Sequence, residues 1–209
     1  MFKKAFSIVL ALALVASVWL VPVSAVDGYG GYAVYRDGVG VNGVIDFWHA
    51  AIMQQPSADY TQPIIHHPGP NSYVKRDSWT NFMAGQNFQG VYRHPNKTAF
   101  NYAQESIVDL ARRLAAENIE YKLTAQIEYG TPHGEWVEPE DIFAIRCDGV
   151  VEYCYEYCGL RVHGDNNSWD ISMSGIPNQN AHSNFLITPK SQAQNYLTRV
   201  SLSKPTGYK

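Results

Sequence analysis

The run from Val44 to Met53 constrains the fold most strongly, because it is strand-like and carries a histidine among apolar residues. In a β-strand, side chains alternate between two faces. One face would carry Ile45, Phe47, His49, Ala51 and Met53. The strand-like run Tyr32 to Tyr35 and the turn-prone residues 36–43 precede it and predict a hairpin. We therefore expect an antiparallel sheet in which His49 is buried or half-buried.

Further strands are expected nearby in the chain. The run Gln62 to His67 ends in a Pro-Gly-Pro turn and can pair with the His49 strand. Residues 88–93 form another short strand candidate, and strand-like pieces follow at residues 169–173, 185–188 and 198–202. Residues 121–141 contain glycine and proline at short intervals and indicate a loop.

Two helices are predicted. The spacing of apolar residues indicates a helix over 101–118, with Asn101 and Gln104 at its start. A second helix is expected from Cys147 to Cys158, ended by Gly159. On this helix Glu152 and Glu156 would lie on the outer face, opposite the cysteines. Together these elements predict the α+β class, with an antiparallel sheet packed against the Cys147 helix.

The chain has three cysteines, Cys147, Cys154 and Cys158, which share one stripe of the expected helix. Cβ atoms four residues apart on a helix are roughly 6 Å apart, too far for a disulfide. Cys147 lies two turns from Cys154, which disfavours a zinc site. We interpret Cys154 and Cys158 as small core residues, and we expect no metal and no cofactor.

Residues 1–25 resemble an export signal, with two lysines, an apolar run and a small-residue cleavage site. The alternative is a membrane anchor, since the run approaches the length of a span. Pro22 and the small residues at the end favour cleavage, so stable membrane insertion is not expected. Residues 26–209 then form one domain. The net charge of −3 and the scattered basic residues argue against nucleic-acid binding, and we expect a monomer.

Cys147 is the expected first residue of its helix, where free amides and the helix dipole stabilise a thiolate. The same amides point to where an oxyanion forms in acyl transfer. Asp148 acts in the opposite direction, because a nearby carboxylate raises a thiol pKa. His49 can supply the imidazolium for an ion pair. Such a thiolate would be alkylated at pH 6, whereas a structural thiol would not.

The segment from Arg146 to Val151 resembles the nucleophile motif of NlpC-type cell-wall peptidases. Residues 48–52 resemble the strand with their catalytic histidine, and residues 64–66 resemble the next strand, which ends in an orienting residue. Both strands precede the cysteine here. That order is similar to the circular permutation of the YaeF/YiiX group and of lecithin:retinol acyltransferase relatives. The resemblance implies a permuted papain-like fold.

By this resemblance Cys147 is the nucleophile, His49 the base and His66 the orienting residue, although His67 is its immediate neighbour. The oxyanion tyrosine has two candidates, Tyr121 and Tyr129, of which we favour Tyr121. Arg146 departs from the family, whose unpermuted members often carry aspartate there.

The expected function is that of a secreted cysteine hydrolase acting through an acyl-enzyme. The resemblance implies a peptidoglycan peptide or a lipid amide or ester as substrate. Two alternatives stay open: a catalytically silent binding domain, and a metal-dependent hydrolase using His49, His66 and His67.

Overall fold

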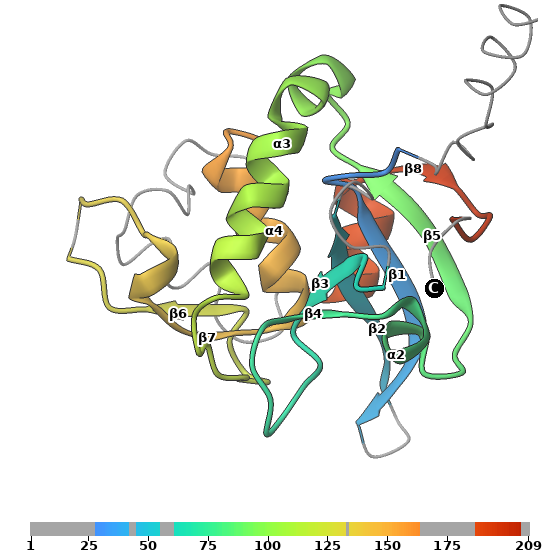
Figure 1. Ribbon diagram of the computed structural model, residues 1–209, viewed down its shortest axis with the longest axis horizontal. Helices are drawn as coiled ribbons and strands as arrows, with labels where there is room; N and C mark the ends of the chain where they lie inside the picture. The colour runs from blue at the N-terminus through green and yellow to red at the C-terminus, as the bar shows by residue number, and fades with distance from the viewer. Residues whose placement is uncertain (1–27, 42–44, 55–60, 133, 164–186, 206–209) are drawn as a thin grey trace, which may run out of the picture.

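The computed structural model describes residues 28–41, 45–54, 61–132, 134–163 and 187–205 (Figure 1). The expected export signal, residues 1–25, and the expected strand at residues 169–173 lie outside these residues. In the described part of the chain, no helix is both long and apolar enough to cross a membrane.

A six-stranded sheet forms the centre of the molecule, and all of its strand pairs are antiparallel. The strand order is β4-β3-β2-β1-β5-β8. The strands are β1 (Ala33–Val41), β2 (Ile45–Met53), β3 (Ile64–His66), β4 (Lys75–Asp77), β5 (Phe88–Arg93) and β8 (Thr198–Ser201). With the helices described below, the protein belongs to the α+β class.

The hairpin of β1 and β2 and the pairing of β2 with β3 are confirmed. The register joins β3 to β2 at Ile52 and Met53. The stretch of β2 that contains His49 and Ala50 extends beyond this pairing. The edge of β2 is therefore accessible to other parts of the chain at these residues.

Two helices lie side by side on one side of the sheet, α3 (Lys97–Leu114) and α4 (Cys147–Tyr157) (Figure 1). The predicted start of the first helix at Asn101 is wrong. The helix begins four residues earlier because the Asn96 side chain caps it, accepting a hydrogen bond from the Ala99 N–H at 3.1 Å. The end of α4 is as expected, with Gly159 at φ +75°.

Both faces of β2 are buried. Ala50 and Ile52 pack into the larger apolar cluster, which also contains Cys147 and other residues of α4. Ala51 and Met53 pack on the other face with α2 (Trp79–Met83), whose N-cap is Ser78. The sheet therefore has a helical layer on each side.

Residues 121–141, expected to be a loop, contain the strand β6 (Ile127–Tyr129), which pairs with β7 (Ile142–Ile145). The short helix η1 (Pro139–Asp141) precedes β7, which leads directly into α4. On the C-terminal side, α6 (Pro189–Ser191) continues into the π-type turn η2 (Gln192–Tyr196). Thr188, expected in a strand, instead caps α6, accepting a hydrogen bond from the Ser191 N–H.

Candidate active site

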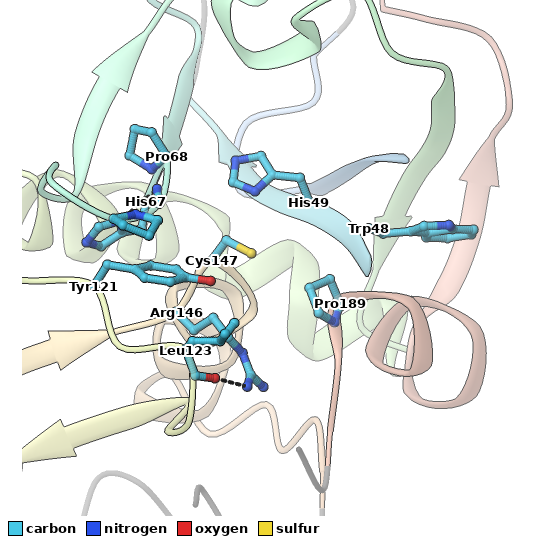
Figure 2. A pocket seen from close by; sticks show the side chains of 11 residues that line it. Trp48, His49, His67, Pro68, Tyr121, Leu123, Arg146, Cys147 and Pro189 are labelled. Carbon is cyan, nitrogen blue, oxygen red and sulfur yellow. Dashed lines mark hydrogen bonds between the residues drawn. The ribbon is translucent and has the colours of Figure 1, made fainter. Parts of the chain in front are cut away.

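A small cavity lies beside β2 and the start of α4 (Figure 2). Its volume is about 80 Å³. Cys147, His49 and Tyr121, which lie far apart in the sequence, all line it. The remaining lining residues are Trp48, His67, Pro68, Gly69, Pro70, Leu123, Arg146 and Pro189.

Cys147 is the first residue of α4, so its own N–H and the next amides lack partners within the helix. Close packing with the segment before β6 holds this turn in place. The Arg146 N–H donates to the Gln126 carbonyl at 2.9 Å, and a Cβ at Gly149 would collide with the same carbonyl oxygen. This contact explains why glycine stands two residues after the cysteine.

The Cys147 thiol is 5% exposed, and its pKa is raised to about 12. Burial is the main cause, and the carboxylate of Asp148 adds to it. The backbone N–H groups of Ala50 and Asp148 act against this shift, as does the charge of Arg146. Cys147 is therefore a protonated thiol at neutral pH, with hydrogen-bond donors already placed to stabilise its anion.

His49 and His66 lie in direct contact. His49 Nε2 and His66 Nδ1 share a hydrogen bond of 2.7 Å. On the other side of its ring, His66 Nε2 lies 3.4 Å from Asp77 Oδ2. This carboxylate also accepts hydrogen bonds from the Ser78 N–H at 2.8 Å and from Asn81 at 2.6 Å, and it pairs with Lys75 at 2.8 Å.

The chain from His49 through His66 to Asp77 fixes the His49 ring and leaves Nδ1 as its available nitrogen. The hydrogen bond from His66 is the main reason why the pKa of Asp77 lies well below its ordinary value. Burial lowers the pKa of both histidines, although Asp77 opposes this at His66. His49 is therefore a neutral imidazole at pH 7.

The resting site differs from the ion pair expected from the sequence. Burial favours the neutral forms of both Cys147 and His49. His49 points to the α2 side of β2, where its ring lies 5.5 Å from that of Phe82, whereas Cys147 approaches from the α4 side. Both line the cavity, yet no hydrogen bond joins them among the contacts of the described residues. Catalytic hydrogen bonds of free enzymes often form fully on substrate binding.

Of the two candidate tyrosines, Tyr121 lines the cavity and Tyr129 does not. Figure 2 shows the Tyr121 hydroxyl directed toward Cys147. Burial raises the pKa of Tyr121, and the proximity of Cys147 adds to the shift. Tyr121 is therefore a neutral hydrogen-bond donor beside the thiol.

His67 also lines the cavity, although its neighbour His66 contacts His49. Its ring lies 5.1 Å from that of Tyr121, and its Nε2 lies 3.2 Å from the carbonyl of Ile119. Because burial lowers its pKa to about 4, His67 is neutral at pH 7. It contacts Tyr121 rather than His49.

Arg146, the residue before Cys147, pairs with the carboxylate that follows it. Its guanidinium makes two hydrogen bonds to Asp148, at 2.6 and 2.8 Å, and donates to the backbone carbonyls of Leu123 and Ile187. This pair fixes the first turn of α4 to the two segments that lead to the cavity wall. Arg146 neutralises the carboxylate beside Cys147.

The prediction that Glu152 and Glu156 lie on an outer face is wrong, because both are buried. Glu152 Oε2 accepts hydrogen bonds from Gln126 at 2.9 Å and from Gln192 at 2.6 Å. Burial raises the pKa of Glu152 to about 8. Glu156 accepts a hydrogen bond from the Val162 N–H at 2.7 Å. Gln126 before β6, Gln192 in η2 and the backbone of Val162 therefore contact this side of α4, which sequence periodicity did not indicate.

The described residues contain no group of three or more histidine, cysteine or acidic side chains arranged to hold a metal ion. His49 and His66 bond to each other through ring nitrogens that a metal would need.

Sequence reasoning did not identify Asp77 or the cavity role of His67. Asp77 lies on a three-residue strand without an apolar pattern. The pairing of β4 with β3, which brings Asp77 to His66, is a tertiary contact that no local signal indicates.

No protein-family model, curated protein or solved structure matches the chain. The assignment of function therefore depends on the residues of this site.

Proposed function

We propose that the protein is an exported cysteine hydrolase that cleaves a peptide or lipid amide or ester through an acyl-enzyme on Cys147. The observation that carries this proposal is the cavity where Cys147 begins a helix beside His49 and Tyr121. A nucleophile, a base fixed by a further group and oxyanion donors are the parts that acyl transfer requires.

In the mechanism, Cys147 Sγ attacks the substrate carbonyl carbon while its proton passes to Nδ1 of His49. In this mechanism the hydrogen bond between His49 Nε2 and His66 leaves Nδ1 as the ring nitrogen that accepts the proton. The first amides of α4 and the Tyr121 hydroxyl donate to the oxyanion. His49 then gives the proton to the leaving amine or alcohol. Water, activated by His49, releases the acyl group and restores the thiol.

The neutral resting pair is compatible with this chemistry. A neutral imidazole is the form that accepts a proton, and a thiol can lose its proton as it attacks. The N–H groups of Ala50 and Asp148 lower the pKa of Cys147 and so stabilise the thiolate that forms during the attack.

The order of elements supports a permuted papain-like fold as part of the proposal. The strand with the base (β2) and the strand with the orienting residue (β3) precede the nucleophile helix (α4). This is the order of the permuted NlpC-type group that the sequence resembles. The signal-like residues 1–25 support export to the cell envelope.

A second candidate, a catalytically silent binding domain, is favoured by one observation. Cys147 is buried, has a raised pKa and makes no hydrogen bond to His49 among the described contacts. A structural thiol would have these properties too.

Intact-protein mass spectrometry separates the two candidates. The protein is incubated with a peptidoglycan digest or with a lipid extract, quenched with acid and mapped by peptide. The hydrolase gives an acyl adduct on Cys147, and the adduct mass identifies the substrate. Cys154→Ala is the matched control, because it removes a buried thiol from the same helix and should keep the adduct. No adduct and no turnover with either extract would support the binding domain.

A further inference from the structure

A buried polar layer packs against the first turns of α4. Its side chains come from β1, from the segment before β6, from α4 itself and from η2. All of them are fully buried, and none lines the cavity: Tyr35, Gln126, Asp148, Glu152 and Gln192. The mechanism proposed above uses none of these side chains as a reacting group.

Glu152 joins the two glutamines of this layer. Its Oε2 accepts a hydrogen bond from Gln126 at 2.9 Å and another from Gln192 at 2.6 Å. Each glutamine also holds the first turn of α4. Gln126 donates to Asp148 Oδ2 at 3.3 Å, and its backbone carbonyl accepts the Arg146 N–H at 2.9 Å. Gln192 donates to the backbone carbonyl of Asp148 at 3.0 Å. Glu152 therefore acts, through two side chains, on the turn that carries the proposed oxyanion donors.

The hydrogen bonds of Glu152 have the pattern of a carboxylic acid. Its Oε2 accepts two hydrogen bonds, as a carbonyl oxygen does, whereas its buried Oε1 has no hydrogen-bond partner among the described residues. Gln126 Oε1 is also buried without such a partner. A carboxylate offers only acceptors and leaves both oxygens unsatisfied. A proton on Glu152 Oε1 is a donor, and the Gln126 amide is already joined to the same carboxyl group by one of the two hydrogen bonds of an amide–acid pair.

The charges that face Glu152 favour the same neutral form. The guanidinium of Arg146 already makes two hydrogen bonds to Asp148 and neutralises that carboxylate. Tyr35 faces the layer from β1, and burial raises its pKa well above the ordinary value, so it stays neutral. The side chains that contact Glu152 from the β6 and η2 sides are uncharged glutamines. An ionised Glu152 would be a second buried anion without a second cation among the described groups that face it, and burial accordingly raises its pKa to about 8.

We infer that Glu152 is a positioning residue, which holds the first turn of α4 in its reactive form only while it is a neutral carboxylic acid. Loss of its proton to solvent removes the donor for Gln126 and adds a negative charge to the helix that begins at Cys147. Both changes disfavour the thiolate and the oxyanion that acyl transfer forms at this turn. This inference rests on the proposed function and adds an alkaline limit to it.

The pH dependence of Cys147 acetylation by p-nitrophenyl acetate tests this role. Rates are measured from pH 6 to pH 10 by peptide mapping after an acid quench, and they are divided by the folded fraction from circular dichroism. The wild-type rate should fall about ten-fold from pH 7 to pH 9, because Glu152 is mostly protonated at the first pH and mostly ionised at the second. An ordinary thiol becomes more reactive over this range. Cys158, whose pKa is about 11, reports that opposite trend in the same sample.

Glu152→Gln separates the proton of Glu152 from its packing. The new amide accepts from both glutamines and donates to Gln126 at every pH, without a charge. Its acetylation rate should not fall between pH 7 and pH 9. Glu156→Gln is the matched control, because Glu156 is buried on the same helix and accepts a hydrogen bond from the Val162 N–H at 2.7 Å. This control should keep the wild-type fall.

Infrared spectroscopy reports the proton on Glu152 independently of the chemistry at Cys147. The absorption of its protonated carboxyl group, assigned by its absence from Glu152→Gln, should be present at pH 7 and largely lost at pH 9. Absence of this band at pH 7 would overturn the inference. So would a wild-type rate that does not fall, or an equal fall in Glu152→Gln, and in both cases acetylation of Cys147 leaves the proposed function standing. No acetylation of Cys147 at any pH rejects the proposed function, and the positioning role with it.

Discussion

Replacing His66 by alanine tests whether its hydrogen bond to His49 orients that ring as the proposed base. The change removes the 2.7 Å bond and leaves His49 Nε2 buried without a partner. An unsatisfied buried polar group costs about 1 to 3 kcal/mol. If the reactive orientation of the His49 ring is destabilised by this amount, the activation free energy of acylation rises equally. The acylation rate then drops roughly five- to 150-fold, at 1.36 kcal/mol per factor of ten.

The rate is measured as single-turnover acylation of Cys147 and divided by the folded fraction from circular dichroism. His94→Ala is the matched control. His94 is half-buried, and both of its ring nitrogens form hydrogen bonds. Its Nε2 lies 2.9 Å from the Arg161 carbonyl, and its Nδ1 accepts from the Asn96 N–H at 3.2 Å. It lies outside the cavity lining. An unchanged rate for His66→Ala, or one equal to that of His94→Ala, would refute the orienting role.

Three further predictions concern stability. Cys154→Ala should lower the free energy of unfolding by about 1 kcal/mol or more, because Cys154 is fully buried. Cys158→Ala should lower it by less, because Cys158 is only half-buried. Equal losses of turnover in these two variants and in Cys147→Ala would contradict the assignment of Cys147 as the one reactive cysteine among the three. The pKa of His67 is about 4 in the folded protein and about 6.5 in the unfolded chain, so the unfolded chain takes up the proton first as the pH falls. The contribution of neutral His67 to folding stability is therefore complete above pH 6.5 and is lost as the pH falls through 4. Urea unfolding at pH 7, 5.5 and 4 should show this loss, and His67→Gln should make it shallower; an identical pH dependence for the variant would count against it. The folded pKa of Glu152 is raised to about 8, so its contribution is lost as the pH rises from about 4.5 through 8. In urea unfolding at pH 4.5 and pH 9, Glu152→Gln should therefore gain stability relative to the wild type at the higher pH. A relative loss at pH 9 would show that Glu152 is buried as an anion.

The sequence predicted those parts of the fold that local patterns determine. The alternation from Ile45 to Met53 gave β2, and the glycine at 159 gave the end of α4. The pattern did not determine which side of β2 faces α4, because Ala50 and Ala51 are both fully buried. Where both faces of a strand are buried, the alternation of residues along it does not indicate which face packs against a given helix.

The candidate site was likewise predicted only where local sequence patterns indicate its residues. Cys147, His49 and Tyr121 have local signals and line one cavity. The charge state of the pair was not foreseen, because the raised pKa of Cys147 depends on burial by distant segments. Glu152 shows the same limitation, since its partners Gln126 and Gln192 come from elsewhere in the chain.

The most direct test of the central claim is site-resolved mass spectrometry after a brief exposure to p-nitrophenyl acetate. Cys158 is more exposed than Cys147 and is an internal competitor for the acetyl group. The account predicts acetylation at Cys147, and a rate at least 100-fold lower in His49→Ala, as expected for loss of a general base. Acetylation at Cys158 instead, or an unchanged rate at Cys147 in His49→Ala, would contradict it.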